Sequence, residues 1–448
     1  MTEEKRRKKI EIPEICRVEG HSAVHIEIVG DRVENVQLDV FEGMRFFERL
    51  IIGHQQDEIP HITSRVCAIC STGHVLAAIR AVEKIAGFAP SPATSLMREL
   101  MHLGMIIESN STHIYALALP DFLGFEDVHQ FASQHTEEFK AWTDLRNLGC
   151  LIQTILGGRP FHPVNLHVGG FSRFPSIEDF QKIETDLRSK YALAIRTCEV
   201  LMKFSPPVRR TSEPVFFALV PENDHYGYFG DQIRSNHGFQ ARVEEYKTYL
   251  KEETVPYSHA KRSSVEGKPI MVGSMARLTM FSDRLSSNAK SIFDSSALAK
   301  GDHNTIWNNL AQGIEIVEAF DRCLAIIETL IQTKAEWDPF DKRQHSRAIV
   351  PPVQGAACGT VECPRGTLYH YYELDEKGFV VAADMITPSA QNTYRIERDI
   401  HEVVSQTINE EYDEEREKTL TRNLETLVRA YDPCNTCATH MVSVKYTS

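Results

Sequence analysis

The sequence has no run of about eighteen apolar residues, the length that a membrane-spanning helix needs. It is also short of positive charge, because 49 Lys and Arg residues stand against 62 Asp and Glu residues, and the net charge is −13. A protein that binds phosphate backbones needs a basic surface. These two deficits exclude a transmembrane helix and argue against nucleic acid as a partner.

The N-terminus also lacks the apolar core of a secretory signal. Residues 5–9 (KRRKK) are followed by residues 10–14 (IEIPE), where two glutamates and a proline interrupt any apolar stretch. We interpret the basic cluster as a solvated tail. A cytoplasmic protein is therefore expected.

Cysteine is too sparse for a disulfide scaffold, because only ten cysteines are spread over 448 residues. Four of the ten stand alone, at Cys16, Cys150, Cys198 and Cys323. Such single cysteines usually pack as small hydrophobic side chains. Cys67 with Cys70 and Cys434 with Cys437 instead form two C-x-x-C pairs near opposite ends of the chain, and in a reducing compartment such pairs indicate metal or redox chemistry.

The N-terminal part of the chain predicts an antiparallel hairpin. Residues 23–29 and 33–40 alternate between apolar and polar side chains, and residues 30–32 (GDR) supply the turn. A second hairpin is expected at residues 371–374 and 379–383. Short strands mixed with polar loops are expected between residues 215 and 280.

Helical patterns cover most of the remaining chain, with Gly87 as the stop of the first helix, Pro120 as the end of the second and Ser176 as the start of the third. The expected helices are residues 67–86, 93–119, 176–204, 304–333 and 394–431. No repeat and no linker divides the chain. The sequence therefore predicts one α+β domain over residues 1–448 that is mainly helical, a bundle of long helices with small antiparallel sheets.

The two cysteine pairs lie in similar surroundings, in residues 65–74 (RVCAICSTGH) and 432–440 (DPCNTCATH). If a helix begins at the first pair, Cys67, Cys70 and His74 share one face of it, and the helix N-terminus lowers the pKa of the thiols. Four thiolates suit zinc, an iron–sulfur cluster or nickel.

The spacing of the pairs is unusual for structural zinc, whose cysteine pairs are typically about 15–20 residues apart. Here residues 71–433 separate the two pairs. A chain of this length also needs no metal to fold. These residues alone leave a structural metal, dithiol redox chemistry and a catalytic metal open.

Two further motifs accompany the cysteine pairs, at residues 17–21 (RVEGH) and 362–366 (ECPRG). The four motifs, in this order from one end of the chain to the other, resemble the large catalytic subunit of cytoplasmic nickel–iron hydrogenases. The resemblance implies the fold of that subunit. It also implies reversible, heterolytic cleavage of H2 into protons and electrons.

By this resemblance, the four cysteines bind a nickel–iron centre whose iron carries carbon monoxide and cyanide. Cys67 and Cys434 correspond to the terminal nickel ligands. Cys70 and Cys437 correspond to the thiolates that bridge nickel and iron. His74 corresponds to a residue that donates a hydrogen bond to the sulfur of the bridging cysteine shortly before it.

The other motifs imply further roles. Glu19, within the N-terminal segment 1–22, matches the family's proton gate and is expected to receive a proton from Cys434. Arg365 matches the arginine that lies over the iron, where its planar guanidinium can bind cyanide and pair with Asp432. Pro364 is expected to fix the loop that carries this arginine.

A second metal, Mg²⁺ or Fe²⁺, is implied near the C-terminus. Glu48, His440 and the backbone near Ile386 match its ligands, and oxygen ligands suit Mg²⁺. Glu42 is the alternative glutamate, and we prefer Glu48 because it precedes Cys67 by nineteen residues, as in the family. Residues 441–448 resemble the extension that a maturation protease removes.

The sequence departs from many members of the family at two places. Ser109 stands where an aspartate is frequent, as is usual in the cytoplasmic branch, and Cys363 stands where alanine is frequent. With Cys358 five residues earlier, a redox-sensitive thiol is possible at Cys363. We prefer packing as a small side chain.

No further set of four cysteines remains for an iron–sulfur cluster, so the electrons need a partner chain. The resemblance implies an iron–sulfur small subunit in a large interface, and further electron-transfer subunits that use a nicotinamide with flavin, ferredoxin or a similar acceptor. Two rivals remain, a scaffold relative of the complex I type and an interaction protein stabilised by structural zinc. Metal analysis separates the three interpretations. A hydrogenase contains nickel and iron, the zinc-stabilised protein contains zinc alone, and the complex I-type relative contains no metal.

Overall fold

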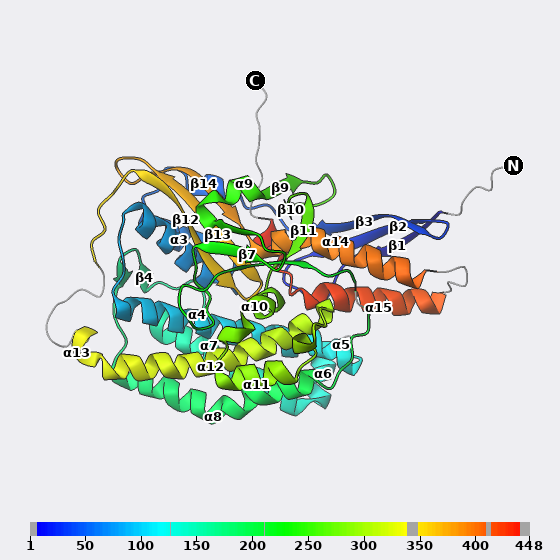
Figure 1. Cartoon of the computed structure of the whole chain (residues 1–448), viewed down its shortest axis with the longest axis horizontal. Coiled ribbons are helices and arrows are strands. Elements are labelled where there is room, and N and C mark those ends of the chain that lie inside the picture. The colour runs from blue at the N-terminus through cyan, green and yellow to red at the C-terminus, as the bar shows by residue number, and fades with distance from the viewer. Residues whose placement is uncertain (1–6, 126, 210, 338–347, 409–413, 440–448) are drawn as a thin grey trace, which may run out of the picture.

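Four long helices form a bundle along one side of the molecule (Figure 1). They are α4 (Pro92–Thr112), α7 (Thr136–Gly157), α8 (Ile177–Leu201) and α12 (Asn308–Gln332). Helix α4 packs against α7 and α12, and α8 packs against the same two helices. The structure, a computed structural model, describes residues 7–125, 127–209, 211–337, 348–408 and 414–439. No helix among these residues combines the length and the apolar character that a membrane crossing requires.

The bundle helices begin where the sequence provides caps. The side chain of Ser176 accepts the backbone N–H of Asp179, and Asp179 reciprocates, which starts α8 as predicted. Ser91 caps α4 in a similar way. Helix α7, which begins at Thr136, was not predicted, because polar residues dominate its first turns.

Pro120 does not end the second predicted helix. Helix α4 continues through a π-helical turn (His113–Ala118) into α5 (Leu119–Leu123), and Gly124 ends it in a left-handed conformation. Pro120 lies in the first turn of α5, where a missing N–H costs little. The π turn begins at His113, whose Nε2 lies 4.0 Å from Asp432 Oδ1.

Three of the four sheets lie on the opposite side of the molecule from the bundle (Figure 1), and the fourth is the two-stranded pair β4 (Leu166–His167) and β5 (Gly170–Phe171). The first, β1 (Arg7–Ile12), β2 (Ser22–Val29) and β3 (Arg32–Val40), is antiparallel and contains the first predicted hairpin. The second is antiparallel β12 (Gly355–Cys363), β13 (Gly366–Leu374) and β14 (Val380–Ile386), and contains the second hairpin. The mainly helical α+β class is therefore confirmed.

The third sheet has six strands in the order β8-β7-β6-β11-β10-β9. Only its β6–β11 pair is parallel. Its strands are β6 (Val215–Leu219), β7 (Gln232–Ser235), β8 (Gln240–Arg242), β9 (Leu250–Thr254), β10 (Lys261–Val265) and β11 (Lys268–Met271). This sheet accounts for the mixed pattern seen between residues 215 and 280.

Two helix predictions were wrong at their boundaries. The predicted helix over residues 394–431 is two helices, α14 (Pro388–Thr407) and α15 (Glu414–Ala430), which contact each other. The predicted helix that begins at Cys67 begins only at Ser71, as α3 (Ser71–Ile85). Helix α3 packs on β12 and β13, and its first turn lies beside the end of β12, because a Cβ on Gly73 would lie 2.4 Å from Cys363 Sγ.

Candidate metal centre

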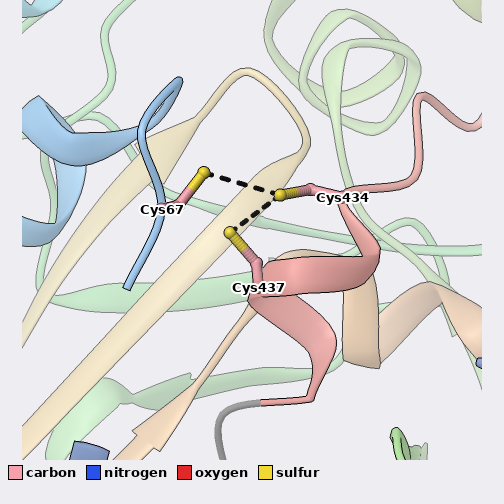
Figure 2. A group of neighbouring side chains, drawn as sticks. All are labelled: Cys67, Cys434 and Cys437. Atoms are coloured by element: carbon pink, nitrogen blue, oxygen red, sulfur yellow. Dashed lines mark hydrogen bonds between the residues drawn. The ribbon is translucent and has the colours of Figure 1, made fainter. Parts of the chain in front are cut away.

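The two cysteine pairs meet in the interior of the protein. The Sγ atoms of Cys67 and Cys434 are 3.5 Å apart, and those of Cys70 and Cys437 are 3.3 Å apart. Within the second pair the Sγ atoms are 2.9 Å apart. Figure 2 shows Cys67 pointing toward Cys434 and Cys437 from a separate segment of the chain. All four side chains are buried.

Local structure presents each thiol to the cluster. Cys70 is the N-cap of α3, and Cys434 is the N-cap of the short helix α16 (Asn435–Ala438). The Ser389 hydroxyl accepts the backbone N–H of Cys434. Arg45 joins the two cysteine segments, because its Nη2 donates to the carbonyl oxygens of Val66 at 2.5 Å and Thr436 at 2.8 Å.

The pKa values of three of the four thiols are shifted, and not all in the same direction. Hydrogen bonds from Cys434 and Cys437 stabilise the Cys70 thiolate and lower its pKa well below the ordinary value. Burial raises the pKa of Cys434 and of Cys437 well above the ordinary value. A metal that binds to Cys434 and Cys437 therefore has to displace the protons of these two thiols.

This arrangement fits a thiolate-bound metal. Two sulfurs bound to one ion at about 2.3 Å lie roughly 3–4 Å apart, and the separations given above lie at or just below that range. A disulfide requires about 2.05 Å, and all four cysteines are free. Cys67, Cys434 and Cys437 present their sulfurs within 4.8 Å of one another, and so do the ligand atoms of Cys70, His74 and Cys437.

Glu19 lies against the second cysteine pair. Its Oε2 accepts the Cys434 thiol at 3.1 Å and the backbone N–H of Thr436 at 3.0 Å, and its Oε1 accepts the Thr436 hydroxyl. Gly20 makes this approach possible, because a Cβ there would lie 2.9 Å from Glu42 Cγ and 3.1 Å from the Thr436 nitrogen. The RVEGH motif thus brings a half-buried carboxylate to a candidate ligand.

Arg365 lies at the turn between β12 and β13 and is buried. Its Nε donates to the Asp432 carbonyl at 2.7 Å, and its Nη2 to Asp432 Oδ1 at 2.9 Å. Its Nη1 donates to Ser109 Oγ at 3.3 Å. Burial alone would lower the pKa of Arg365, but the charges of Asp432 and the thiols raise it well above the ordinary value. Pro364, also buried, precedes it in the same turn.

His74 lies beside both cysteines that correspond to bridging ligands, because its ligand nitrogen and the sulfurs of Cys70 and Cys437 all lie within 4.8 Å of one another. Its Nε2 lies 4.0 Å from the Sγ of Cys437. On its other side, Nδ1 is 3.0 Å from His370 Nε2, and His370 Nδ1 is 2.6 Å from the Tyr372 hydroxyl. His370 and Tyr372 are two positions apart in β13, so their side chains lie on the same face of this strand, which packs against α3.

Glu48 lies next to the strand that contains Ile386. Its Oε1 accepts the backbone N–H of Met385 at 2.6 Å. Burial, and then the charge of Asp384, raise the pKa of Glu48 to about 9. Glu42 lies elsewhere, 3.7 Å from the His21 ring nitrogen. His440 and residues 441–448 lie outside the described residues.

Sequence reasoning missed several residues of this region. Arg45, His370 and Arg277 belong to no motif that the sequence revealed, and Thr436 lies within the second cysteine motif but was not singled out. A buried arginine has no periodic signature in a single sequence. Cys363 and Cys358 are both buried, and five positions along β12 place them on opposite faces of the strand, so they do not pair.

Comparison with known proteins agrees with this geometry. The chain matches the nickel-dependent hydrogenase family over residues 45–148 and 210–440. It is 36% identical over 434 residues to the sulfhydrogenase 1 subunit alpha of Pyrococcus furiosus, with 97% of this chain and 98% of the relative covered. It is 33% identical over 435 residues to the sulfhydrogenase 2 subunit alpha of the same organism, covering 97% and 100%.

Solved structures share the fold. An NAD+-reducing [NiFe]-hydrogenase in the H2-reduced state superposes with a TM-score of 0.81 at 24% identity, over 97% of this chain and 99% of that chain. The Ni-Fe-Se hydrogenase from Desulfovibrio vulgaris Hildenborough superposes with a TM-score of 0.77 at 18% identity, over 97% and 100%. The chain belongs to the nickel-dependent hydrogenase family, as the large catalytic subunit of a nickel–iron hydrogenase.

Proposed function

We propose that Cys67, Cys70, Cys434 and Cys437 bind a nickel–iron centre whose iron carries carbon monoxide and cyanide. The observation that carries this proposal is the convergence of four buried thiols from opposite ends of the chain. When bound, such a centre polarises H2 and makes it acidic, much as a metal acidifies bound water. The chain's own residues then have to orient the centre, exclude water and remove a proton.

The division of the four ligands is proposed from the family resemblance, and the two cysteines of the second pair have different neighbours. Cys434 faces the carboxylate of Glu19, whereas Cys437 faces the ring of His74. We assign Cys67 and Cys434 as terminal nickel ligands and Cys70 and Cys437 as bridging ligands. A proton donor beside a bridging thiolate is a typical supporting contact in a metal site.

Proton transfer is assigned to Glu19. A proton on Cys434 Sγ can pass to Glu19 Oε2 over 3.1 Å, which is within reach of a direct transfer. The hydrogen bonds of Thr436 to the same carboxylate fix its orientation. Because Glu19 is only half-buried, its carboxylate can exchange the proton with groups nearer the surface.

Arg365 is assigned to the iron side of the centre. Asp432 fixes its guanidinium by two hydrogen bonds and Ser109 accepts a third, which leaves two N–H groups for a cyanide. Pro364 limits the conformations of the turn that carries it. Ser109, rather than an acid, completes this part of the site.

A second ion, Mg²⁺ or Fe²⁺, is proposed at Glu48, the backbone oxygen of Ile386 and His440. Two of these three positions are adjacent in the structure, because Glu48 accepts the N–H of the residue before Ile386. A maturation protease that removes residues 441–448 is proposed with it. The mass of the purified chain tests that cleavage.

The electrons require a second chain. Among the described residues, the groups that could hold a metal contain only the four cysteines of the centre and His74. We propose an iron–sulfur small subunit as the direct partner, and further subunits that pass electrons to a nicotinamide, ferredoxin or similar acceptor. Relatives named as alpha subunits support such an assembly. A cytoplasmic location is proposed with it.

Metal analysis with infrared spectroscopy of the purified complex tests the proposal. Nickel, iron in excess of nickel because the iron–sulfur clusters of the small subunit add to it, and bands of carbon monoxide and cyanide are expected. Zinc alone, or nickel without these bands, contradicts it. An H2-dependent reduction of an artificial dye by the same preparation then tests the activity.

A further inference from the structure

The position of Arg365 depends on a very short turn. Cys363 and Gly366 are paired across β12 and β13, so Pro364 and Arg365 are the only two residues between the strands. Gly366 has a φ of 130°, and a Cβ there would lie 2.6 Å from Val272 Cβ. The tip of this hairpin, residues 363–366, therefore packs directly on the segment that leads into α10 (Ser274–Phe281).

Arg277, in the first turns of α10, reaches the hairpin tip from within the protein. Its side chain is 1% exposed. Nη1 donates to the Cys363 carbonyl at 2.9 Å, and Nη2 donates to the Pro364 carbonyl at 3.1 Å. These are the two backbone oxygens immediately before Arg365. The guanidinium of Arg277 thus binds the stretch of main chain that determines the position of Arg365.

The guanidinium of Arg277 is itself held by two buried carboxylates. Its Nε and Nη2 donate to Glu315 at 2.6 and 2.9 Å, and its Nη1 donates to Glu362 at 2.8 Å. With the two carbonyls, all five N–H groups have an acceptor. Arg277 therefore ties α10 to α12 through Glu315 and to the end of β12 through Glu362.

Each carboxylate has further partners that fix it. Glu315 accepts the hydroxyls of Tyr226 and Ser274, both at 2.6 Å. Glu362 accepts the Leu219 N–H at 2.8 Å and the Thr367 hydroxyl at 2.6 Å. Glu315 lies on α12, outside the hairpin, whereas Glu362 and Thr367 flank the tip. Arg277 therefore ties the hairpin tip to the helical part of the protein through Glu315.

We propose that Arg277 is a positioning residue of the metal centre, and that its guanidinium holds the Cys363–Pro364 backbone where Arg365 can reach the metal ligands. The inference rests on the proposed role of Arg365. It does not require Arg277 to touch the metals or H2. Its effect passes through the placement of Arg365, and small misplacements of a catalytic group can cost about 10²-fold in rate.

A variant pair separates this role from general stabilisation. Arg277→Lys keeps the charge but cannot supply the planar array that reaches both carboxylates and both carbonyls. Arg98→Lys is the matched control, because Arg98 is also buried and binds Glu83 with two hydrogen bonds, but contacts the His167 carbonyl instead of the hairpin tip.

The complex carrying each variant is compared with the unchanged complex by infrared spectroscopy, metal content and turnover of H2. For Arg277→Lys, full nickel and iron content, shifted cyanide bands and a kcat lower by about 10²-fold with an unchanged KM are expected. Arg98→Lys should leave the bands in place. Unshifted bands in Arg277→Lys, or equal shifts in both variants, overturn the inference.

Hydrogen exchange supplies a readout that needs no metal. The peptide covering residues 363–367 should exchange faster in Arg277→Lys than in Arg98→Lys, and equal rates overturn the inference. If Arg277→Lys does not fold, Glu362→Gln takes its place. The amide nitrogen of this variant, turned toward Arg277 Nη1, removes that one hydrogen bond and keeps the side-chain volume. An unchanged exchange rate of the 363–367 peptide in Glu362→Gln overturns the inference as well. Absence of carbon monoxide and cyanide bands from the unchanged complex contradicts the proposed function, and the exchange comparison still decides the role of Arg277.

Discussion

The main chain of Glu19 pairs with that of Cys434 as a parallel β-bridge, although the two residues are 415 positions apart in the sequence. The pairing is reinforced where Asn435 N–H donates to the Glu19 carbonyl at 2.9 Å. The backbone pairing therefore places the Glu19 carboxylate beside the Cys434 sulfur without help from a metal. The proton acceptor Glu19 and the candidate metal ligand Cys434 are thereby held next to each other by the main chain.

Glu19→Gln is expected to leave the metals bound and to suppress H2/D2O exchange by orders of magnitude. The amide keeps the volume, and its oxygen can still accept the backbone N–H of Thr436, but it cannot take up a proton. Metal content and exchange are measured on the same preparation. Glu14→Gln, an exposed glutamate of the same segment, is the control and should exchange normally. Undiminished exchange in Glu19→Gln would remove this residue from the proton path.

The motifs predicted which residues meet, because each carries side chains whose chemistry is recognisable in a single sequence. Two C-x-x-C pairs, an isolated glutamate before a glycine and an arginine after a proline could all be named in advance. The structure brings the first two together directly, and it places Arg365 against Asp432. The hairpins and the capped helix α8 were also predictable, since their signals are local.

Boundaries and supporting contacts could not be predicted in the same way. The segment at Cys67 and Cys70 looks helical, but the helix begins at Ser71, because the two thiols turn inward ahead of it. Pro120 looks like a helix end, yet a preceding π turn accommodates it. Arg277 and His370 depend on which elements pack together, and that information is distributed over the whole chain.

Cys67→Ala and Cys434→Ser are each expected to abolish nickel retention. Each change removes one of four soft ligands, and the hard hydroxyl of serine is a poor substitute. Nickel content of the purified protein is the measurement. Cys198→Ala is a suitable control, because this buried cysteine lies in α8 and contacts Gly313 instead of the thiol cluster. A full nickel content in either ligand variant would refute the ligand assignment.

Arg365→Lys is expected to lower the rate of H2 oxidation by about 10²–10³-fold with little change in metal content. Lysine keeps the charge but loses the planar donor set that binds Asp432 through Nε and Nη2 at the same time. Arg322→Lys serves as the control, because Arg322 makes a similar two-point contact with Glu99 elsewhere in the protein. A rate within twofold of the unchanged enzyme would exclude a role for Arg365 in turnover.

Mg²⁺ binding at Glu48 is expected to weaken as the pH falls. Burial, and then Asp384, raise the pKa of this carboxyl to about 9 from 4.5, so at neutral pH an ion has to displace a proton. The apparent affinity should therefore fall by up to about tenfold per pH unit below 9. Calorimetry in buffers of different ionisation enthalpy counts the proton released.

The same shift gives the sign of a stability effect. Between pH 4.5 and about 9 the folded metal-free chain keeps a proton on Glu48 that the unfolded chain releases, so the free energy of unfolding should fall as the pH rises through this range. Added Mg²⁺ should oppose that fall, because the ion stabilises the ionised carboxylate in the folded state. Glu48→Gln should remove both effects, whereas Glu42→Gln, which changes the other glutamate of this stretch, should keep them. Proton release that persists in Glu48→Gln would assign the binding to a different carboxylate.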